Sequence, residues 1–290
     1  MSDNIPFIRV PSSDFPSDIL KWMKINAKPK MLLKLMKCCK YFQHFPEFPF
    51  FVVKEISFCY KDEGDEYEDH WWLMTLDDKT QIFKGLKSIE RVTKKFWITK
   101  LLVFNVPEYL IPKIAVCDIR ILHLDKPISY DDFKFLTASG NVKELNIWES
   151  IKYSNGDPVY IDKIFECVPK VTDIWFYSEM SVFDFDFINT LENIDASKLE
   201  CFTLLTISFS HFLLFTKFMD KNPHVKYRLY FNDGSLSPEE TKAIEKYMQR
   251  IIDAGITKYP PPDIGFLGRT NKQWFDLHKL SLDYFRTRIS

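Results

Sequence analysis

Apolar triplets with the spacing i, i+3, i+5 recur along this chain, with successive starts 21 to 29 residues apart. The clearest are Ile98-Leu101-Val103, Ile119-Leu122-Leu124, Val142-Leu145-Ile147, Val171-Ile174-Phe176 and Leu199-Phe202-Leu204. An earlier candidate is Val53-Ile56-Phe58, and a weaker one begins at Val225. A period of this length is typical of a solenoid, in which each unit buries its apolar face against its neighbours. Because solenoids act mainly through binding, the period favours recognition over catalysis.

The composition agrees with an ordered protein of balanced charge. Hydrophobic residues make up 46% and aromatic residues 16% of the 290 positions, which is ample for an extended core. The 39 basic and 40 acidic residues give a net charge of -1, so the charge does not favour a nucleic-acid partner. The sequence holds no apolar stretch of about 18 residues and no apolar core near its start, so we expect neither a membrane span nor a secretory signal.

The cysteines carry no ligand pattern. They are Cys38, Cys39, Cys59, Cys117, Cys167 and Cys201. Without a CxxC pair or a Cys/His cluster, we expect no zinc site and no cofactor. Reduced, mostly buried thiols are typical of a cytoplasmic protein, with the nucleus as the second compartment that fits.

Beyond the first triplets, strand-like segments alternate with helical ones. A capping pattern predicts a helix after Ser129, and apolar stripes predict helices near 184–193 and 209–220. Ser237-Pro238-Glu239-Glu240 predicts the start of a longer helix that ends at Gly255. Strand, helix and parallel strand in succession imply right-handed crossovers. We therefore predict an α/β fold in which a parallel sheet lines the inner face of a horseshoe.

Two short helices are predicted ahead of the repeats, so residues 1–48 form a helical segment before a solenoid over 49–290 that ends in capping helices. Their sequences are Phe15-Pro16-x-Asp18-Ile19-Leu20 and Leu32-Leu33-Lys34-Leu35-x-x-Cys38-Cys39-Lys40-x-Phe42. Over roughly residues 15–45 this pattern resembles an F-box, which begins with a Leu-Pro-like pair and ends in Leu-x-x-Val-Cys-Lys-x-aromatic. Here Phe15 replaces the leading Leu, Cys38 the Val and Phe42 the usual Trp.

The triplets resemble a divergent leucine-rich repeat, Leu-x-x-Leu-x-Leu. The position that usually holds Asn or Cys is occupied by Pro127, Ser150, Glu179 and Ile207, so the buried asparagine ladder of that family is missing. A short F-box followed by irregular repeats is similar to the F-box-like families expanded in nematodes. The resemblance implies a substrate-recognition subunit of a Skp–cullin–F-box ubiquitin ligase.

If the resemblance holds, the opening helices bind a Skp-family adaptor and, through it, a cullin, while the repeats bind an unknown target protein. The adaptor-binding residues by motif match are Pro16, Ile19, Leu20, Leu32, Leu35 and Met36. The alternative is a repeat scaffold for protein interactions, in which these helices only cap the first repeat.

Strand alternation predicts which side chains face the target. The apolar triplet positions face the helices, so the residues between and after them face the open side of the sheet. These are Phe104, His123, Asp125, Asn146, Trp148, Asp173, Trp175, Tyr177 and Thr203. Large aromatic residues on such a face are typical anchors of an interface. The alternative is that a C-terminal segment, residues 260–290, folds back and covers them.

The sequence holds no catalytic constellation, so we expect no enzymatic activity. The six histidines are scattered, and no Gly-rich phosphate loop or Gly-x-Ser-x-Gly elbow is present. The Asp131-Asp132 pair is best explained as first-turn helix residues stabilised by the helix dipole. The acidic stretch 62–69 is predicted to be a solvated loop, with docking of a basic partner or a cation as the alternative.

Overall fold

The computed structural model describes residues 50–59, 69–105, 107–177, 190–191, 193–232, 234–267 and 269–289, together with eight single positions between 16 and 35. The protein is mixed α/β and divides into two compact units. Unit 1 comprises Met1–Thr99 and Tyr109–Val116, and unit 2 comprises Lys100–Glu108 and Cys117–Ser290.

Unit 1 is built on antiparallel strands rich in aromatic residues. Its elements are β1 (Phe50–Cys59), β2 (His70–Thr75), β3 (Thr80–Lys84), η1 (Leu86–Arg91), the first half of β4 (Lys95–Phe104) and most of β5 (Ile114–Cys117). Strand β1 lies between β2 and β4. The rings of Phe58 and Trp71 lie 4.9 Å apart in the core, and Trp71 Nε1 donates to Leu86 O at 2.7 Å. The buried indole therefore has its hydrogen bond satisfied.

Unit 2 is built on a parallel sheet with the order β13-β12-β11-β10-β8-β6-β4. Its strands are β6 (Ile121–Leu124), β8 (Glu144–Ile147), β10 (Asp173–Tyr177), β11 (Cys201–Ile207), β12 (Lys226–Phe231) and β13 (Asp263–Gly265), beside the second half of β4. One column of paired side chains crosses this sheet, each at most 1% exposed: Phe104, Leu124, Ile147, Phe176, Leu204, Leu229 and Ile264. This column is the core of the unit.

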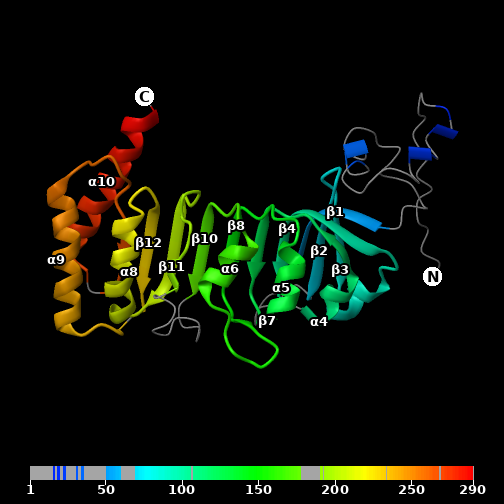
Figure 1. Cartoon of the computed structure of the whole chain (residues 1–290), viewed down its shortest axis with the longest axis horizontal. Helices are drawn as coiled ribbons and strands as arrows, with labels where there is room; N and C mark the ends of the chain where they lie inside the picture. The colour runs from blue at the N-terminus through cyan, green and yellow to red at the C-terminus, as the bar shows by residue number, and fades with distance from the viewer. Residues whose placement is uncertain are drawn as a thin grey trace. The chain divides into compact units, whose positions relative to one another are not determined.

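Helices cover the buried face of the sheet of unit 2. They are α5 (Tyr130–Thr137), α6 (Ile161–Cys167), α8 (Phe209–Lys221) and α9 (Pro238–Ala254). Helix α10 (Asn271–Ile289) lies against the opposite face at the end of the sheet, beside Lys226 of β12 and Asp263 of β13. Figure 1 shows α5, α6 and α8 in front of the strands, on one face of the sheet. Helix α8 packs through Phe215, whose ring centroid lies 5.1 Å from that of Phe202 on β11. The short strands β7 (Ile128–Ser129) and β9 (Ile151–Lys152) pair with each other, and α4 (Pro107–Leu110) and η2 (Ile111–Lys113) follow β4 along the chain.

The predicted helix ends are confirmed where the structure describes them. The hydroxyl of Ser129 accepts from the N–H of Asp132 at 3.1 Å. Ser237 and Glu240 form a complete capping box at the start of α9, and Gly255 follows its end with a φ of 66°. Residues 274–289, which sequence patterns leave unassigned, form most of α10. No helix in the described part of the chain has both the length and the apolar character that crossing a membrane requires.

The burial and the parallel pairing predicted for four triplets are confirmed. All twelve members of the triplets that begin at Ile119, Val142, Val171 and Leu199 are at most 5% exposed, and their strands pair in parallel. In the triplet that begins at Ile98, the last two predicted positions are wrong by one residue. Leu102 and Phe104 face the core, whereas Leu101 and Val103 are half-buried. The stretch Leu101-Leu102-Val103-Phe104 is apolar on both faces, so its pattern cannot decide which face is buried.

Two further expectations differ from the structure. Val53, Ile56 and Phe58 are buried as expected, but they lie on β1, which pairs with β2 in antiparallel orientation and so is not a parallel repeat. Phe104 was expected on the open side of the sheet and is instead fully buried in the core column, which corrects its assignment as a target contact. The two differences have separate causes: alternation within β1 carries no information about the direction of its neighbour, and β4 is apolar on both faces.

Several predictions fall outside the described residues. These are adaptor-site residues Leu20, Leu32 and Met36, the acidic loop except Asp69, and most of the helix expected near 184–193. The described positions Asp18, Ile19, Trp22, Met23, Met31, Lys34 and Leu35 are helical. Pro16 is exposed and lies outside helix, as suits a residue at the start of one.

Candidate interaction surface

The face of the parallel sheet opposite the core column is the surface on which the predicted target contacts gather. We call it the open face. One row of paired residues across it is His123, Asn146, Trp175, Thr203, Arg228 and Asp263. The neighbouring row contains Glu144, Asp173, Cys201 and Lys226. Alternation places these side chains together, because their neighbours along each strand belong to the core.

An aromatic pair stands at the carboxyl ends of β8 and β10. The ring of Trp148 stacks on that of Tyr177, with centroids 5.7 Å apart and planes 26° apart. Trp148 remains 43% exposed. A stacked pair of large rings that keeps this much exposed surface offers apolar contact area at a small cost in side-chain entropy.

Next to this pair, a polar network fixes the orientation of Trp175. Its indole Nε1 donates to Asp173 Oδ1 at 2.7 Å, and the guanidinium carbon of Arg228 lies 5.5 Å from its ring centroid. Trp175 and Arg228 stand on either side of Thr203 in the register, and Thr203 has no exposed surface. Thr203 therefore lies on the predicted face but is covered by its larger neighbours.

The other end of the open face carries polar atoms without hydrogen bonds. His123 Nε2 lies 3.5 Å from Glu144 Oε1, an ion-pair distance when the ring is protonated, but not in hydrogen-bond geometry. Among the described residues, neither His123 Nε2 nor Asn146 Oδ1 has a hydrogen-bond partner. Burial raises the pKa of nearby Asp125, while the charges of His123 and Lys126 lower it. Both of these atoms are buried, so a bound partner does not reach them in this arrangement.

The C-terminal segment covers only one end of the open face. Strand β13 extends the sheet beyond β12, and the ammonium of Lys226 lies 4.6 Å from the ring centroid of Phe285 on α10. Trp148 is 43% exposed, so the alternative in which residues 260–290 fold back and cover the aromatic residues does not hold for Trp148.

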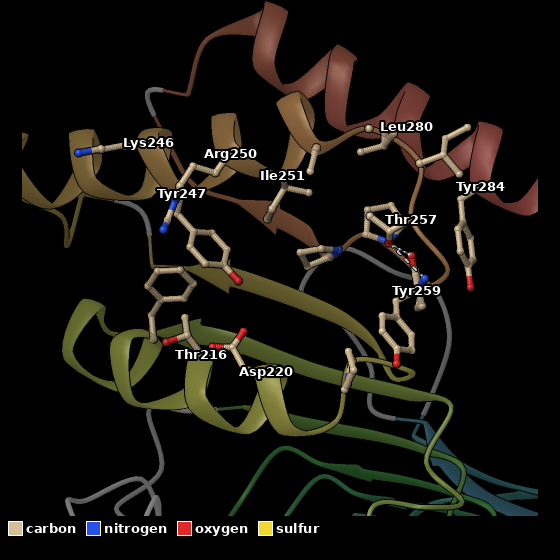
Figure 2. Close-up of a pocket in the computed structure, with 18 of the residues that line it drawn as sticks. Thr216, Asp220, Lys246, Tyr247, Arg250, Ile251, Thr257, Tyr259, Leu280 and Tyr284 are labelled. Atoms are coloured by element: carbon tan, nitrogen blue, oxygen red, sulfur yellow. Dashed lines mark hydrogen bonds between the residues drawn. The ribbon is translucent and has the colours of Figure 1, made fainter.

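A separate groove of about 830 Å³ lies on the helix side, between α8, α9 and the segment that leads to β13 (Figure 2). Its walls are mostly apolar and include the exposed Leu213 and Ile256, whereas Asp220 and Arg250 supply charge. Burial raises the pKa of Tyr247 to about 12, with a contribution from the charge of Asp220. The described lining residues include Thr216, Lys246 and Tyr247 but no Cys, Ser or His. No local sequence pattern predicts this groove, because its walls come from separate helices.

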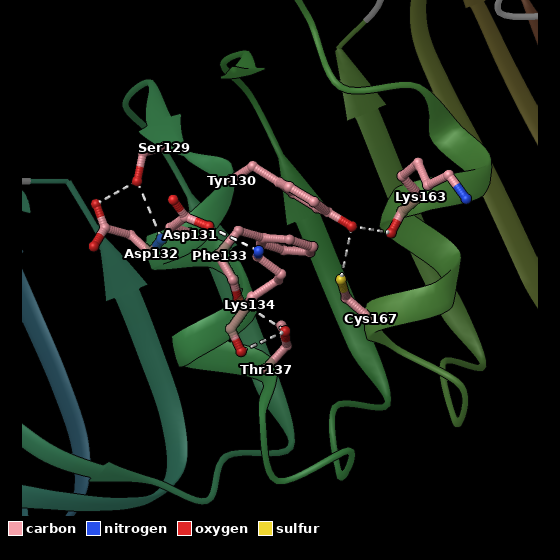
Figure 3. Close-up of polar contacts among 9 residues, drawn as sticks. All are labelled: Ser129, Tyr130, Asp131, Asp132, Phe133, Lys134, Thr137, Lys163 and Cys167. Atoms are coloured by element: carbon pink, nitrogen blue, oxygen red, sulfur yellow. Dashed lines mark hydrogen bonds and ion pairs between the residues drawn. The ribbon is translucent and has the colours of Figure 1, made fainter. Parts of the chain in front are cut away.

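A polar cluster on α5 and α6 is structural (Figure 3). Cys167 Sγ donates to Tyr130 Oη at 3.6 Å, and the Tyr130 hydroxyl donates to the carbonyl of Lys163 at 3.5 Å. Burial raises the pKa of Tyr130. Asp131 and Asp132 lie in the first turn of α5, as the sequence predicts. In the described part of the chain, no group of three or more His, Cys, Asp or Glu residues could hold a metal ion.

Comparison with known proteins gives no relative: no family model matches the chain, and no curated protein or solved structure matches it significantly.

Proposed function

We propose that this chain is a protein-recognition subunit that binds its target through the open face of unit 2. The observation that carries this proposal is the exposed Trp148 stacked on Tyr177, beside the Trp175–Arg228 contact. Tryptophan, tyrosine and arginine are the residue types most enriched among energetic anchors of protein interfaces. They are already held in place by ring contacts, so little conformational entropy is lost when a partner binds.

The second half of the proposal concerns the adaptor. The F-box-like sequence over residues 15–45 supports docking to a Skp-family adaptor and, through it, to a cullin. Helical positions Ile19, Trp22 and Met31 are 44%, 65% and 53% exposed, which agrees with an apolar helix surface that meets a partner. The chain would then bridge adaptor and target, using divergent leucine-rich repeats, with no catalytic activity of its own.

Co-purification with a Skp-family adaptor tests the adaptor half. The full chain should retain the adaptor, and Leu32→Asp combined with Leu35→Asp should abolish retention because charge is placed in an apolar interface. Lys34→Asp is the matched control, since Lys34 is an exposed helical residue beside Leu35. Its retention should match the wild type. If the wild-type chain did not retain the adaptor, the adaptor half of the proposal would be refuted. The alternative, a scaffold whose opening helices only cap the first repeat, would remain.

Target capture tests the open face separately. A target identified by cross-linking to the wild-type chain should lose affinity by about 30-fold or more with Trp148→Ala, as expected for an interface anchor. Leu213→Ala, at an exposed apolar residue on the helix side, should leave the affinity unchanged. Equal affinities for the two variants would remove the open face as the binding surface.

A further inference from the structure

A second hollow on unit 2 lies where strands β8, β10, β11 and β12 begin. It has a volume of about 990 Å³, and we call it the basic groove. Its charged lining residues are Lys143, Lys170, Lys198, Lys226, Arg228, Asp173 and Glu200, and His224 also lines it. Tyr284 and Phe285 of α10 form an aromatic wall at the β12 side. The groove shares Asp173, Cys201, Lys226 and Arg228 with the open face, so a partner that lies on that face can extend into it.

The basic residues follow the repeat of the sheet. Lys143 directly precedes β8, Lys170 and Lys198 each lie three residues before the strands β10 and β11, and Lys226 begins β12. Neighbouring strands in a sheet are about 4.8 Å apart. The repeats therefore align one cation per strand along the groove, a spacing that an extended peptide can follow.

The described lining residues of the groove carry a net positive charge. Five basic and two acidic side chains line it, although the whole chain has a net charge of only -1. No described carboxylate lies within ion-pair distance of any of the five; Lys226 and Arg228 rest instead on the rings of Phe285 and Trp175. Aromatic rings hold a cation without cancelling its charge. A cleft with an excess of one sign of charge attracts partners of the opposite sign.

We propose that the basic groove binds an acidic, extended segment of the target protein, with an apolar side chain of that segment against Phe285. This inference rests on the proposed function of the open face. Phe285 is 38% exposed, so part of its ring is free for such a contact. Asp173 and Glu200 supply acceptors for peptide N–H groups and repel a continuous phosphate backbone, which favours an acidic peptide over a nucleic acid.

Fluorescence anisotropy with the full chain tests the inference. The probe is a labelled peptide of about twelve residues, mostly Asp and Glu with one central Phe, and the comparison probes are a Lys-rich peptide of the same length and an oligothymidylate. Of the three probes, the acidic peptide should bind and the other two should not. Its affinity should fall as the salt concentration is raised. Lys170→Glu combined with Lys198→Glu should weaken binding by about tenfold or more, because two attractive charges become repulsive.

The matched control is Lys217→Glu combined with Lys242→Glu, which reverses two exposed lysines on α8 and α9 and should leave the affinity within about twofold. Circular dichroism would verify that both double variants are folded. Absence of acidic-peptide binding, equal effects of the two double variants, or tighter binding of the oligothymidylate would each overturn the inference. Continued retention of the adaptor and of a target sensitive to Trp148→Ala would then show that only this inference had failed.

Discussion

The ring of Tyr230 lies directly against the backbone of Gly265, its partner in the register of β12 and β13. A Cβ atom at residue 265 would stand 2.6 Å from Tyr230 Cδ1 and 3.0 Å from Cε1. The Tyr230 hydroxyl donates to Asp263 Oδ2 at 2.9 Å, so the ring is held at both ends. Glycine at this position therefore allows the last strand to join the sheet.

Gly265→Ala should lower the free energy of unfolding by about 1–3 kcal/mol, because the Tyr230 ring must move and its hydrogen bond is disturbed. Urea denaturation measures the change. In a Tyr230→Ala background the same substitution should cost much less, since the colliding ring is gone. An equal cost in both backgrounds would show that the ring contact is not the cause.

The register of β4 makes a second prediction. Phe104→Ala should lower the free energy of unfolding by about 3–5 kcal/mol, because a fully buried ring leaves a cavity in the core column. Leu101→Ala, at a half-buried position three residues earlier, should cost clearly less. A larger loss of stability for Leu101→Ala than for Phe104→Ala, measured by thermal or urea denaturation, would contradict this prediction. It would favour the triplet Ile98-Leu101-Val103 as the buried set.

The start of helix α9 makes a third prediction. Ser237→Ala removes the hydroxyl that accepts from Glu240 N–H, and it should cost about 1 kcal/mol of stability. Glu240→Ala removes the other half of the capping box, in which its carboxylate accepts from Ser237 N–H at 2.8 Å. Glu239→Ala is the control, since Glu239 lies in the same first turn without a part in the box. In chemical denaturation, Ser237→Ala and Glu240→Ala should each have a lower free energy of unfolding than Glu239→Ala.

The pH dependence of stability provides a fourth prediction, at Asp173. Burial raises the pKa of Asp173 above its ordinary 3.8, against the hydrogen bond from Trp175 and the charge of Arg228. Because the folded state then binds the proton more tightly than the unfolded chain, this group lowers stability as the pH rises from 3.8 through the raised pKa. Asp173→Asn should therefore be at least as stable as the wild type near neutral pH, with the difference vanishing below 3.8.

Asp195→Asn is the opposite case. Hydrogen bonds from Ser197 hold the pKa of Asp195 below its ordinary value. The contribution of this carboxylate to stability is therefore present above 3.8 and is lost as the pH falls through the lowered pKa. Urea denaturation midpoints of both variants and the wild type, measured across the acidic pH range, would test the two opposite pH dependences together. A loss of stability at neutral pH in Asp173→Asn would contradict the prediction.

Much of unit 2 could be predicted from local patterns. The triplets from Ile119 onward mark buried positions because only alternating apolar residues can bury one face of a strand. The caps at Ser129 and Ser237 are equally local, since they depend on side chains within four residues. Trp148, Trp175 and Tyr177 follow from the same alternation, and the structure places them on the face where it predicts them.

Other features depend on segments distant in sequence. The face of β4, the antiparallel pairing of β1 with β2, and the covering of Thr203 by Trp175 and Arg228 are set by the register between strands. The basic groove belongs to this class too, because its lysines lie about 28 residues apart and meet only when the strands align. Local periodicity was sufficient to identify the buried positions of strands with one apolar face, such as β6, β8, β10 and β11, because burial there follows the period of the element. The side chains that meet across strands could be identified only in the folded unit, because the pairing of distant segments depends on how the whole unit packs.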